Sequence, residues 1–187
     1  MLTTVKNPLV NDLDLAALAE MVEAIEQDAS KATAAFRVTT RWTGQTRSES
    51  VVDGFDLGGD RITRLHKIVA DEPCELLGND SAPNPQELLM AAFNACITVG
   101  YVAGASLRGI NLESLEIRTK GQLDLRGFLG LSEAVPPGYE SVEYEVSIKG
   151  DGSAADFEEI HQTVMKTSPN YFNMSRPIPL YGKLLVG

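Results

Sequence analysis

Residues 84–109 read NPQELLMAAFNACITVGYVAGASLRG, and this stretch decides the fold of the chain. Its middle, from Leu88 to Leu107, holds 20 residues without a charge, between Glu87 and Arg108. An Asn followed by Pro is typical of a helix N-cap and first helical position, and a Gly such as Gly109 is typical of a helix end. The stretch therefore predicts one long helix that starts at residue 85 and runs to Arg108.

This helix is long enough to cross a lipid bilayer, but its composition indicates another role. It contains five Ala and two Gly together with Asn94, Thr98 and Ser106, and it lacks flanking basic or aromatic anchors. A helix that is apolar all round and rich in small residues is typical of a soluble core, where it packs closely against another helix. We therefore expect a buried central helix and no membrane span.

Length and charge limit the function classes that the chain can belong to. Its 187 residues suit one ordinary domain, and 43% of them are hydrophobic, which is enough to form a core. The 16 Lys and Arg residues stand against 26 Asp and Glu residues, so the net charge is −10. Nucleic-acid binding needs clustered basic residues, and so does binding to an anionic membrane surface. We expect neither partner.

Metal, cofactor and disulfide chemistry have little support in the sequence. Cys74 and Cys96 are the only cysteines, too few for a disulfide scaffold and short of a four-ligand zinc site. His66 and His161 have no metal-type spacing, and neither a phosphate-binding loop nor a serine-nucleophile motif is present. We predict no metal and no cofactor. The two cysteine thiols are the remaining candidates for reactive groups. A structural disulfide between them stays open.

The N-terminal part combines one helix with three strands. Residues 12–29 predict an amphipathic helix capped by Asn11 or Asp12, and we assign residues 1–30 to an N-terminal helical arm. The start of the chain shows no basic segment followed by an apolar run, so we expect no signal peptide. Alternating patterns predict strands over residues 35–42, 47–55 and 61–70, the last two joined by a glycine-rich turn at 58–60.

The C-terminal part has the same mixture of elements. Strands are predicted over residues 112–123 and 139–149, and a short final strand over 178–186. Ser153 and Asp156 resemble a capping box that opens a last helix, which we expect to stop at residues 167–170. The element order defines an α+β fold with two helices on largely antiparallel sheets. We assign residues 31–187 to one domain.

A family resemblance appears where the long helix begins. Residues 71–73 read DEP and residues 77–96 read LGNDSAPNPQELLMAAFNAC. Together they resemble the hallmark of the OsmC/Ohr family, DEP followed by GG-D-x-x-P-x-P-x-E-LLLAALAAC. The likeness continues through residues 108–110, 123–130 and 167–169 and covers roughly residues 33–182.

The resemblance implies an OsmC-like fold, in which antiparallel sheets surround a long buried central helix in an intertwined cytoplasmic homodimer. In the peroxidase members of the family, a helix cysteine attacks an organic hydroperoxide and becomes a sulfenic acid. A second cysteine then forms a disulfide, which an external dithiol reduces. An arginine from the N-terminal hairpin, paired with a glutamate at the start of the helix, polarises the site.

The resemblance also assigns residues of this chain to these roles. Cys96 matches the attacking cysteine. Arg47 is the candidate arginine because it follows a short turn as the family arginine does, and Arg41 is the alternative. The position of the glutamate, ten residues before the cysteine, holds Gln86; the neighbouring Glu87 points about 100° further round a helix.

The second cysteine of the family aligns with Ser168, and a serine cannot form a disulfide. Cys74 lies in a loop and is expected to be a passive thiol. The main hypothesis is therefore reduction of organic hydroperoxides through Cys96, with an external thiol as reductant, in defence against oxidative stress. The alternative, motivated by Gln86 and Ser168, is a dimeric binding or stress-associated protein with the same fold and no peroxidase turnover.

Overall fold

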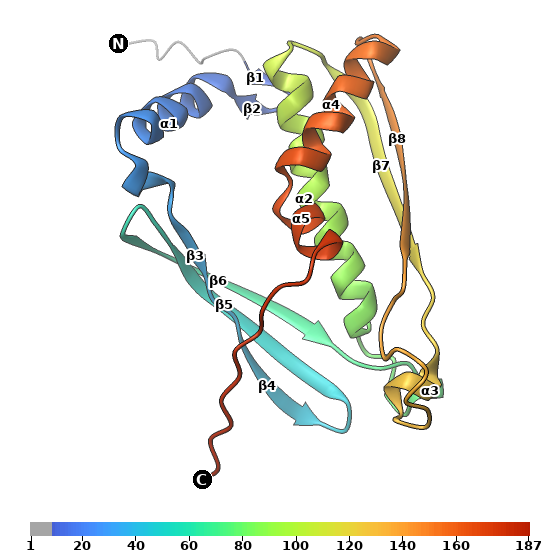
Figure 1. The fold of residues 1–187 in the computed structure, drawn as a ribbon. Helices are drawn as coiled ribbons and strands as arrows, with labels where there is room; N and C mark the ends of the chain where they lie inside the picture. The colour runs from blue at the N-terminus through green and yellow to red at the C-terminus, as the bar shows by residue number, and fades with distance from the viewer. Residues whose placement is uncertain (1–8) are drawn as a thin grey trace. The chain divides into compact units, whose positions relative to one another are not determined.

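The computed structural model describes residues 9–187 (Figure 1). The chain divides into two compact units, residues 1–89 and residues 90–187, and each is described by itself. The division into an arm of residues 1–30 and a domain of residues 31–187 stays a prediction.

The first unit opens with a short hairpin and a helix. The elements are β1 (Leu9–Val10), β2 (Leu13–Asp14), α1 (Leu15–Gln27) and a 3-10 helix at Ala29–Ala32. The side chain of Asp14 caps α1 by accepting hydrogen bonds from the backbone N–H groups of Ala16 and Ala17. Asn11 and Asp12 both have positive φ and form the turn of the hairpin, so the prediction that one of them caps the helix is wrong.

An antiparallel sheet follows in the same unit. Its strands are β3 (Ala34–Phe36), β4 (Thr39–Gly44), β5 (Arg47–Leu57) and β6 (Asp60–Ala70). Strand β5 pairs with β6 along its length and with both β3 and β4, all antiparallel. The predicted second and third strands are confirmed, whereas the predicted strand over residues 35–42 is split into β3 and β4.

This sheet has no apolar core of its own. Among the described residues of the first unit, no apolar side chain is buried. Trp42 is 76% exposed and Phe36 is 71% exposed, although both lie within strands. A sheet gains stability when one of its faces is covered, so these side chains are available to a covering surface.

A buried carboxylate organises the loop that follows β6. Asp71 is 1% exposed and accepts hydrogen bonds from the hydroxyls of Thr46 and Ser81 at 2.8 and 2.7 Å. It also accepts from the backbone N–H groups of Glu72, Asn79 and Ser81. These hydrogen bonds, chiefly those from Ser81 and Thr46, lower the pKa of Asp71 far below its usual value. Asp71 therefore holds the β4–β5 hairpin and the loop before the long helix together.

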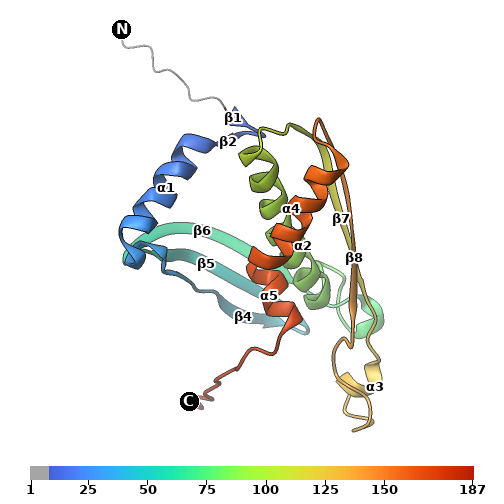
Figure 2. The same ribbon diagram turned by 45° about the horizontal axis from the view of Figure 1, so that its top comes forward.

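The second unit contains the hydrophobic core. The long helix α2 (Pro85–Leu107) begins at the end of the first unit and continues through this one. The other elements are β7 (Leu112–Gly121), α3 (Leu125–Phe128), β8 (Val142–Gly150), α4 (Ala154–Thr167) and α5 (Pro169–Ser175). Figures 1 and 2 both show α4 alongside α2. The buried apolar side chains come from α2, α4 and the turn after α2: Phe93, Ile97, Tyr101, Ala105, Ile110, Ile160 and Val164.

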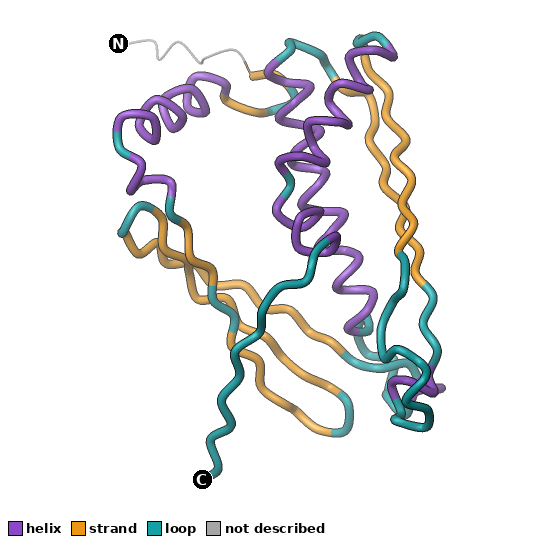
Figure 3. The backbone as a smooth tube through the Cα atoms, viewed as in Figure 1, coloured by secondary structure: helices purple, strands orange, loops and turns teal. Residues whose placement is uncertain are grey.

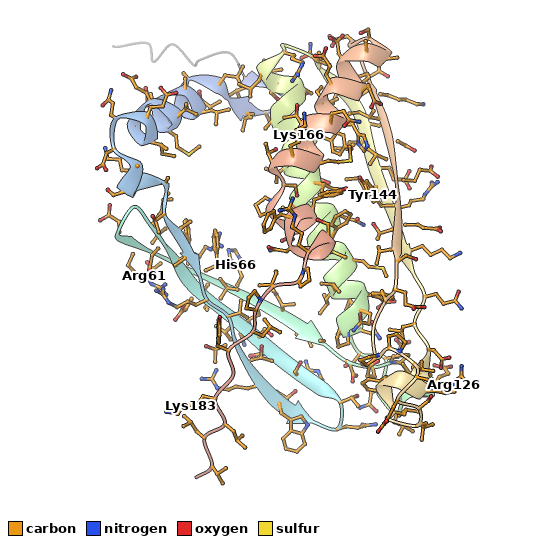
Figure 4. The ribbon with its side chains drawn as sticks, viewed as in Figure 1. Arg61, His66, Arg126, Tyr144, Lys166 and Lys183 are labelled. Atoms are coloured by element: carbon orange, nitrogen blue, oxygen red, sulfur yellow. The ribbon has the colours of Figure 1, made fainter. Side chains whose placement is uncertain are left out.

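The antiparallel pair β7–β8 covers this core from one side. Leu115 and Ile117 of β7 and Val146 of β8 pack against the buried cluster. Tyr144 projects from β8 toward the helices (Figure 4) and packs edge-on against Phe93, with ring centroids 5.3 Å apart. The α+β class with antiparallel sheets, predicted from the element order, is thus what the chain adopts.

One face of α2 is buried in the single chain and the opposite face is not. Phe93, Ile97 and Tyr101 are at most 4% exposed. Ala91 and Ala95 are exposed, and Val99 is 68% exposed. Burial of the whole helix, which the sequence predicts, is not reached within one chain and stays a prediction.

The last residues differ from expectation. Residues 177–187 form no strand in the single chain and are drawn as loop in Figure 3, so the predicted strand over 178–186 is wrong for this structure. Leu180, Leu184 and Val186 are at least 85% exposed. An apolar strand pattern needs a partner edge to form hydrogen bonds, and the described part of the chain pairs none with this segment.

The hydrogen bonds of Asp71 generate a prediction about stability and pH. Replacing Asp71 by Asn removes the charge and one acceptor oxygen, so the melting temperature at pH 7 is expected to fall by several degrees. The folded-state pKa is lowered, so the stabilisation is complete above the unfolded pKa of about 3.9 and is lost as the pH falls below it. The difference between wild type and Asp71→Asn is therefore expected to shrink below about pH 4.

Thermal melts between pH 7 and pH 3 measure this difference. Glu75→Gln is the matched control, because Glu75 is an exposed carboxylate in the same loop region. Equal melting temperatures for Asp71→Asn and Glu75→Gln at every pH would contradict the stabilising role of Asp71.

Candidate functional site

Cys96 lies in the middle of α2 and is partly buried. Its neighbours one turn away on the helix are Ala92 and Gly100, two of the smallest side chains. Small neighbours leave the sulfur accessible from the side and let another element approach it. The element that does so is the end of α4.

Helices α2 and α4 pack closely because two glycines of α2 face branched side chains of α4. A Cβ placed on Gly104 would lie 3.0 Å from Cγ2 of Ile160, and one on Gly100 would lie 3.0 Å from Cγ2 of Val164. The contacts step back by four residues on α2 as they step forward by four on α4, so the two helices run antiparallel. The next pair in this series is Cys96 and Ser168.

The thiol of Cys96 contacts the hydroxyl of Ser168, as the four-residue steps along the two helices predict. Sγ of Cys96 lies 3.4 Å from Oγ of Ser168, although 72 positions separate the two residues in the sequence. Ser168 is 6% exposed. It is both the C-cap of α4 and the N-cap of α5. Its Oγ accepts a hydrogen bond from the N–H of Tyr171 at 3.3 Å. Ser168 is therefore fixed in place by backbone hydrogen bonds.

Helix α5 is tied directly to α2 beside the thiol. The side-chain amide of Asn170 donates to the backbone oxygen of Ala92 at 2.8 Å. The sequence offered no signal for this contact except that Asn170 follows Ser168-Pro169, a combination typical of a helix start. The expected stop at residues 167–170 is confirmed as the end of α4, but a new helix begins there at once.

The structure does not bring the predicted arginine into the same unit as Cys96. Arg47 is the first residue of β5 in the first unit, next to the tight turn of the β4–β5 hairpin. It is partly buried, and Nη1 donates to Oγ1 of Thr43 at 3.1 Å. Arg41, the alternative, is exposed and lies opposite Glu49 in the sheet register. The contact of either arginine with the thiol stays a prediction.

Gln86 and Glu87 occupy the first turn of α2 and have different environments. The side chain of Asn84 accepts from the N–H groups of Gln86 and Glu87, and Glu87 accepts from the N–H of Asn84 at 2.8 Å. This reciprocal pair is a capping arrangement, which confirms Asn84 and Pro85 as the predicted helix start. Glu87 is thus engaged by the helix cap, and the role of Gln86 at the thiol stays a prediction.

Cys74 is exposed in a short 3-10 helix (Cys74–Leu76), and both cysteines are free thiols. The disulfide left open by the sequence is therefore absent from this structure. Among residues 9–187, no group of three or more His, Cys, Asp or Glu side chains is arranged to hold a metal ion.

A second polar pair lies in the same unit, away from the thiol. The hydroxyl of Tyr101 is hydrogen-bonded to Nδ1 of His161, and burial raises the pKa of Tyr101 to about 12. The pair lines a cavity of about 660 Å³ whose lining residues do not include Cys96 or Ser168. His161 of α4 is half-buried and its ring stacks against that of Tyr101.

The chain thus has an α+β fold with a partly buried thiol in the middle of α2, beside a hydroxyl from the end of α4. Residues 78–181 match the family model described as OsmC-like protein. This match covers more than half of the sequence, and the chain belongs to the OsmC family. No curated protein matches the chain.

Solved structures share the fold at low sequence identity. An OsmC-like protein from Mycoplasma pneumoniae is 14% identical with a TM-score of 0.59, covering 75% of this chain and 86% of that chain. An OsmC-like protein of unknown function from Vibrio cholerae is 15% identical with a TM-score of 0.52, covering 73% and 91%. A Psychrobacter arcticus protein is 14% identical with a TM-score of 0.56, covering 72% and 85%.

Within the described residues, α2 is the one helix long and apolar enough to cross a membrane. Length and composition alone are weak evidence for a span, because the core helix of a soluble protein passes the same test. The buried side chains of α2 pack against α4 and the β7–β8 pair, as those of a core helix do.

The close packing of α2 and α4 generates a prediction. Replacing Gly100 by Leu inserts a side chain where even a Cβ would press on Val164, so the free energy of unfolding is expected to fall by about 1–3 kcal/mol. Gly138→Leu is the matched control, because a Cβ on Gly138 meets nothing within 4 Å. Chemical denaturation measures both variants, and equal losses of stability would contradict the close approach.

Proposed function

We propose that this chain reduces organic hydroperoxides to alcohols through Cys96, with an external thiol as reductant, in defence against oxidative stress. The observation that carries the proposal is a partly buried thiol in the family's helix motif, with the hydroxyl of Ser168 3.4 Å from its sulfur. The Psychrobacter arcticus protein of similar fold is named for a proposed role in osmotic stress and detoxification, which agrees with a stress function.

The first step oxidises Cys96. Its thiolate attacks one oxygen of the hydroperoxide, so an S–O bond forms while the O–O bond breaks. The other oxygen leaves as an alkoxide and takes up a proton, which gives the alcohol. Cys96 becomes a sulfenic acid, and the hydroperoxide is reduced by two electrons.

The second step uses a thiol from outside the chain, because Ser168 cannot supply a sulfur. An external thiol attacks the sulfenic acid, forms a mixed disulfide with Cys96 and releases water. A second external thiol then attacks the external sulfur of this disulfide, which releases the Cys96 thiol and leaves a disulfide between the two external thiols. Reduced thiols are abundant in the cytoplasm, which is where we place the protein.

A second copy of the chain would complete the site. Ten positions along an α-helix rise about 15 Å, so Gln86 cannot reach the Cys96 sulfur of its own helix. We therefore propose a homodimer in which Arg47 and Gln86 of one copy lie near Cys96 of the other. Arg47 would stabilise the thiolate and the developing alkoxide, because a guanidinium donates strong hydrogen bonds to anions.

Exposed apolar surface supports the homodimer. Trp42 in the first unit, Val99 on α2 and Leu184 near the C-terminus are each more than two thirds exposed in the single chain. Large apolar side chains left exposed in a single chain are characteristic of a surface that a partner covers. An intertwined pair of chains would cover the open face of α2 and the sheet of the first unit together.

Loss of the Cys96 sulfur is expected to abolish the activity. Cys96→Ser should reduce hydroperoxide consumption, measured with cumene hydroperoxide and a dithiol reductant, to the uncatalysed background. Cys74→Ser is the matched control and should retain the wild-type rate, because Cys74 is an exposed loop thiol. A sulfenic-acid trap followed by mass spectrometry should label Cys96 in the wild type and in Cys74→Ser.

Two results would contradict the peroxidase proposal. One is an unmodified Cys96 after exposure to hydroperoxide, and the other is equal turnover in wild type and Cys96→Ser. An unmodified Cys96 in a folded dimer would instead favour the alternative, a binding or stress-associated protein without peroxidase turnover.

The homodimer has a separate test. Val99→Glu places a charge on the exposed apolar face of α2 and is expected to shift the mass in multi-angle light scattering from dimer to monomer or aggregate. Thr163→Glu, on the exposed face of α4, is the control and should leave the mass unchanged. A wild-type chain that runs as a monomer at micromolar concentration overturns the proposal.

A further inference from the structure

A buried hydroxyl needs an acceptor for its proton as well as a donor for its oxygen. Oγ of Ser168 already accepts from the N–H of Tyr171. Within residues 9–187, the sulfur of Cys96 is the remaining atom found within hydrogen-bond distance of this hydroxyl. The proton of Ser168 is thus available to Cys96 and is needed there when the sulfur is ionised, because a thiolate can only accept.

We infer that Ser168 is a positioning residue for Cys96: its hydroxyl donates to the sulfur, stabilises the thiolate and fixes where the sulfur points. The inference rests on the proposed function and deepens it, since it assigns a role to a residue that cannot act as a resolving thiol. Ser168 acts through the sulfur and does not touch the hydroperoxide.

The position of Ser168 is built by the packing that precedes it. Val164 presses against Gly100, and the N–H of Ser168 donates to the oxygen of Val164 at 2.9 Å. Asn170 then holds α5 against the backbone of α2 at Ala92. The hydroxyl therefore faces the sulfur from a rigid point at the junction of two helices, and little ordering is needed when the thiolate forms.

A hydroxyl at position 168 also determines how oxidised Cys96 can be reduced. When Cys96 is oxidised to the sulfenic acid, Ser168 stays beside it as a hydroxyl, so no disulfide forms within this pair. The oxidised sulfur remains open to attack by a small external thiol, which is the reductant class that the site accepts. A sulfur at position 168 would change this outcome, because a thiol would stand in place of the hydroxyl.

The first experiment measures Cys96 without any hydroperoxide. In a Cys74→Ser background, the rate of alkylation by iodoacetamide is followed from pH 5 to pH 10. Ser168→Ala is expected to move the midpoint of this profile up by about one pH unit and to slow alkylation at pH 7 about tenfold. Ser168→Thr restores the hydroxyl and should return the profile toward that of the parent.

Ser168→Ala also removes the N-cap of α5, so a second variant must show what the loss of a helix cap does by itself. Ser153 caps α4 and has no contact with Cys96, since its hydroxyl bonds to Asp156. Ser153→Ala should lower the melting temperature as a lost cap does and leave the alkylation profile unchanged. An unchanged profile in Ser168→Ala overturns the inference, and so does a shift of equal size in Ser153→Ala.

The second experiment tests the placement of the two side chains. Ser168→Cys, also in the Cys74→Ser background, is treated with diamide, which oxidises a pair of thiols to a disulfide and is itself reduced to the hydrazine. Peptide mapping without reductant should find positions 96 and 168 linked, whereas the parent chain should show no such link. Absence of the link in folded Ser168→Cys overturns the placement.

Hydroperoxide replaces diamide in a parallel sample. Here Cys96 is oxidised to the sulfenic acid, and the thiol at position 168 displaces water to give the same disulfide. Linkage by diamide but not by hydroperoxide would support the placement of residue 168 beside Cys96 and count against the peroxidase proposal. The two proposals therefore fail in distinguishable ways.

Discussion

The close approach of α2 and α4 at Gly100 and Gly104 is the contact on which the second unit depends. With no side chain on these two positions, Val164 and Ile160 pack directly against the helix, and both are buried. The same approach carries the end of α4 to the level of Cys96. A larger residue at Gly100 would thus disturb the core and the thiol environment together, which couples the stability of this unit to its chemistry.

Elements with local signals could be predicted from the sequence, and elements that need a partner could not. The start of α2 at Asn84-Pro85 and the capping box of Ser153 and Asp156 are short-range patterns, and both are present in the structure. Helices α3 and α5 escaped prediction because each is at most seven residues long, too short to show a helical repeat of apolar residues. The strand expected over residues 178–186 had an alternating pattern but has no strand to pair with in the described chain.

The same contrast between short-range signals and long-range contacts applies to the candidate site. Cys96 was identifiable from its motif, and Ser168 from its alignment with a family cysteine, but their contact depends on the four-residue steps between two antiparallel helices. Glu87 belongs to the helix cap, because its carboxylate accepts a hydrogen bond from the N–H of Asn84. The position of Arg47 relative to the thiol depends on contacts between parts of the chain, and no short-range pattern encodes those.

Both units of the single chain leave apolar side chains uncovered. The described residues of the first unit bury a carboxylate, Asp71, but no apolar side chain, so hydrogen bonds and strand pairing hold that unit together. The second unit has a core, yet it leaves Val99 exposed on the helix that carries Cys96. In the proposed homodimer, a second copy would cover the exposed side chains of the sheet and of the helix face, and this burial would add stability. Because the thiol lies on that helix, assembly in the proposed homodimer would also control what reaches the sulfur.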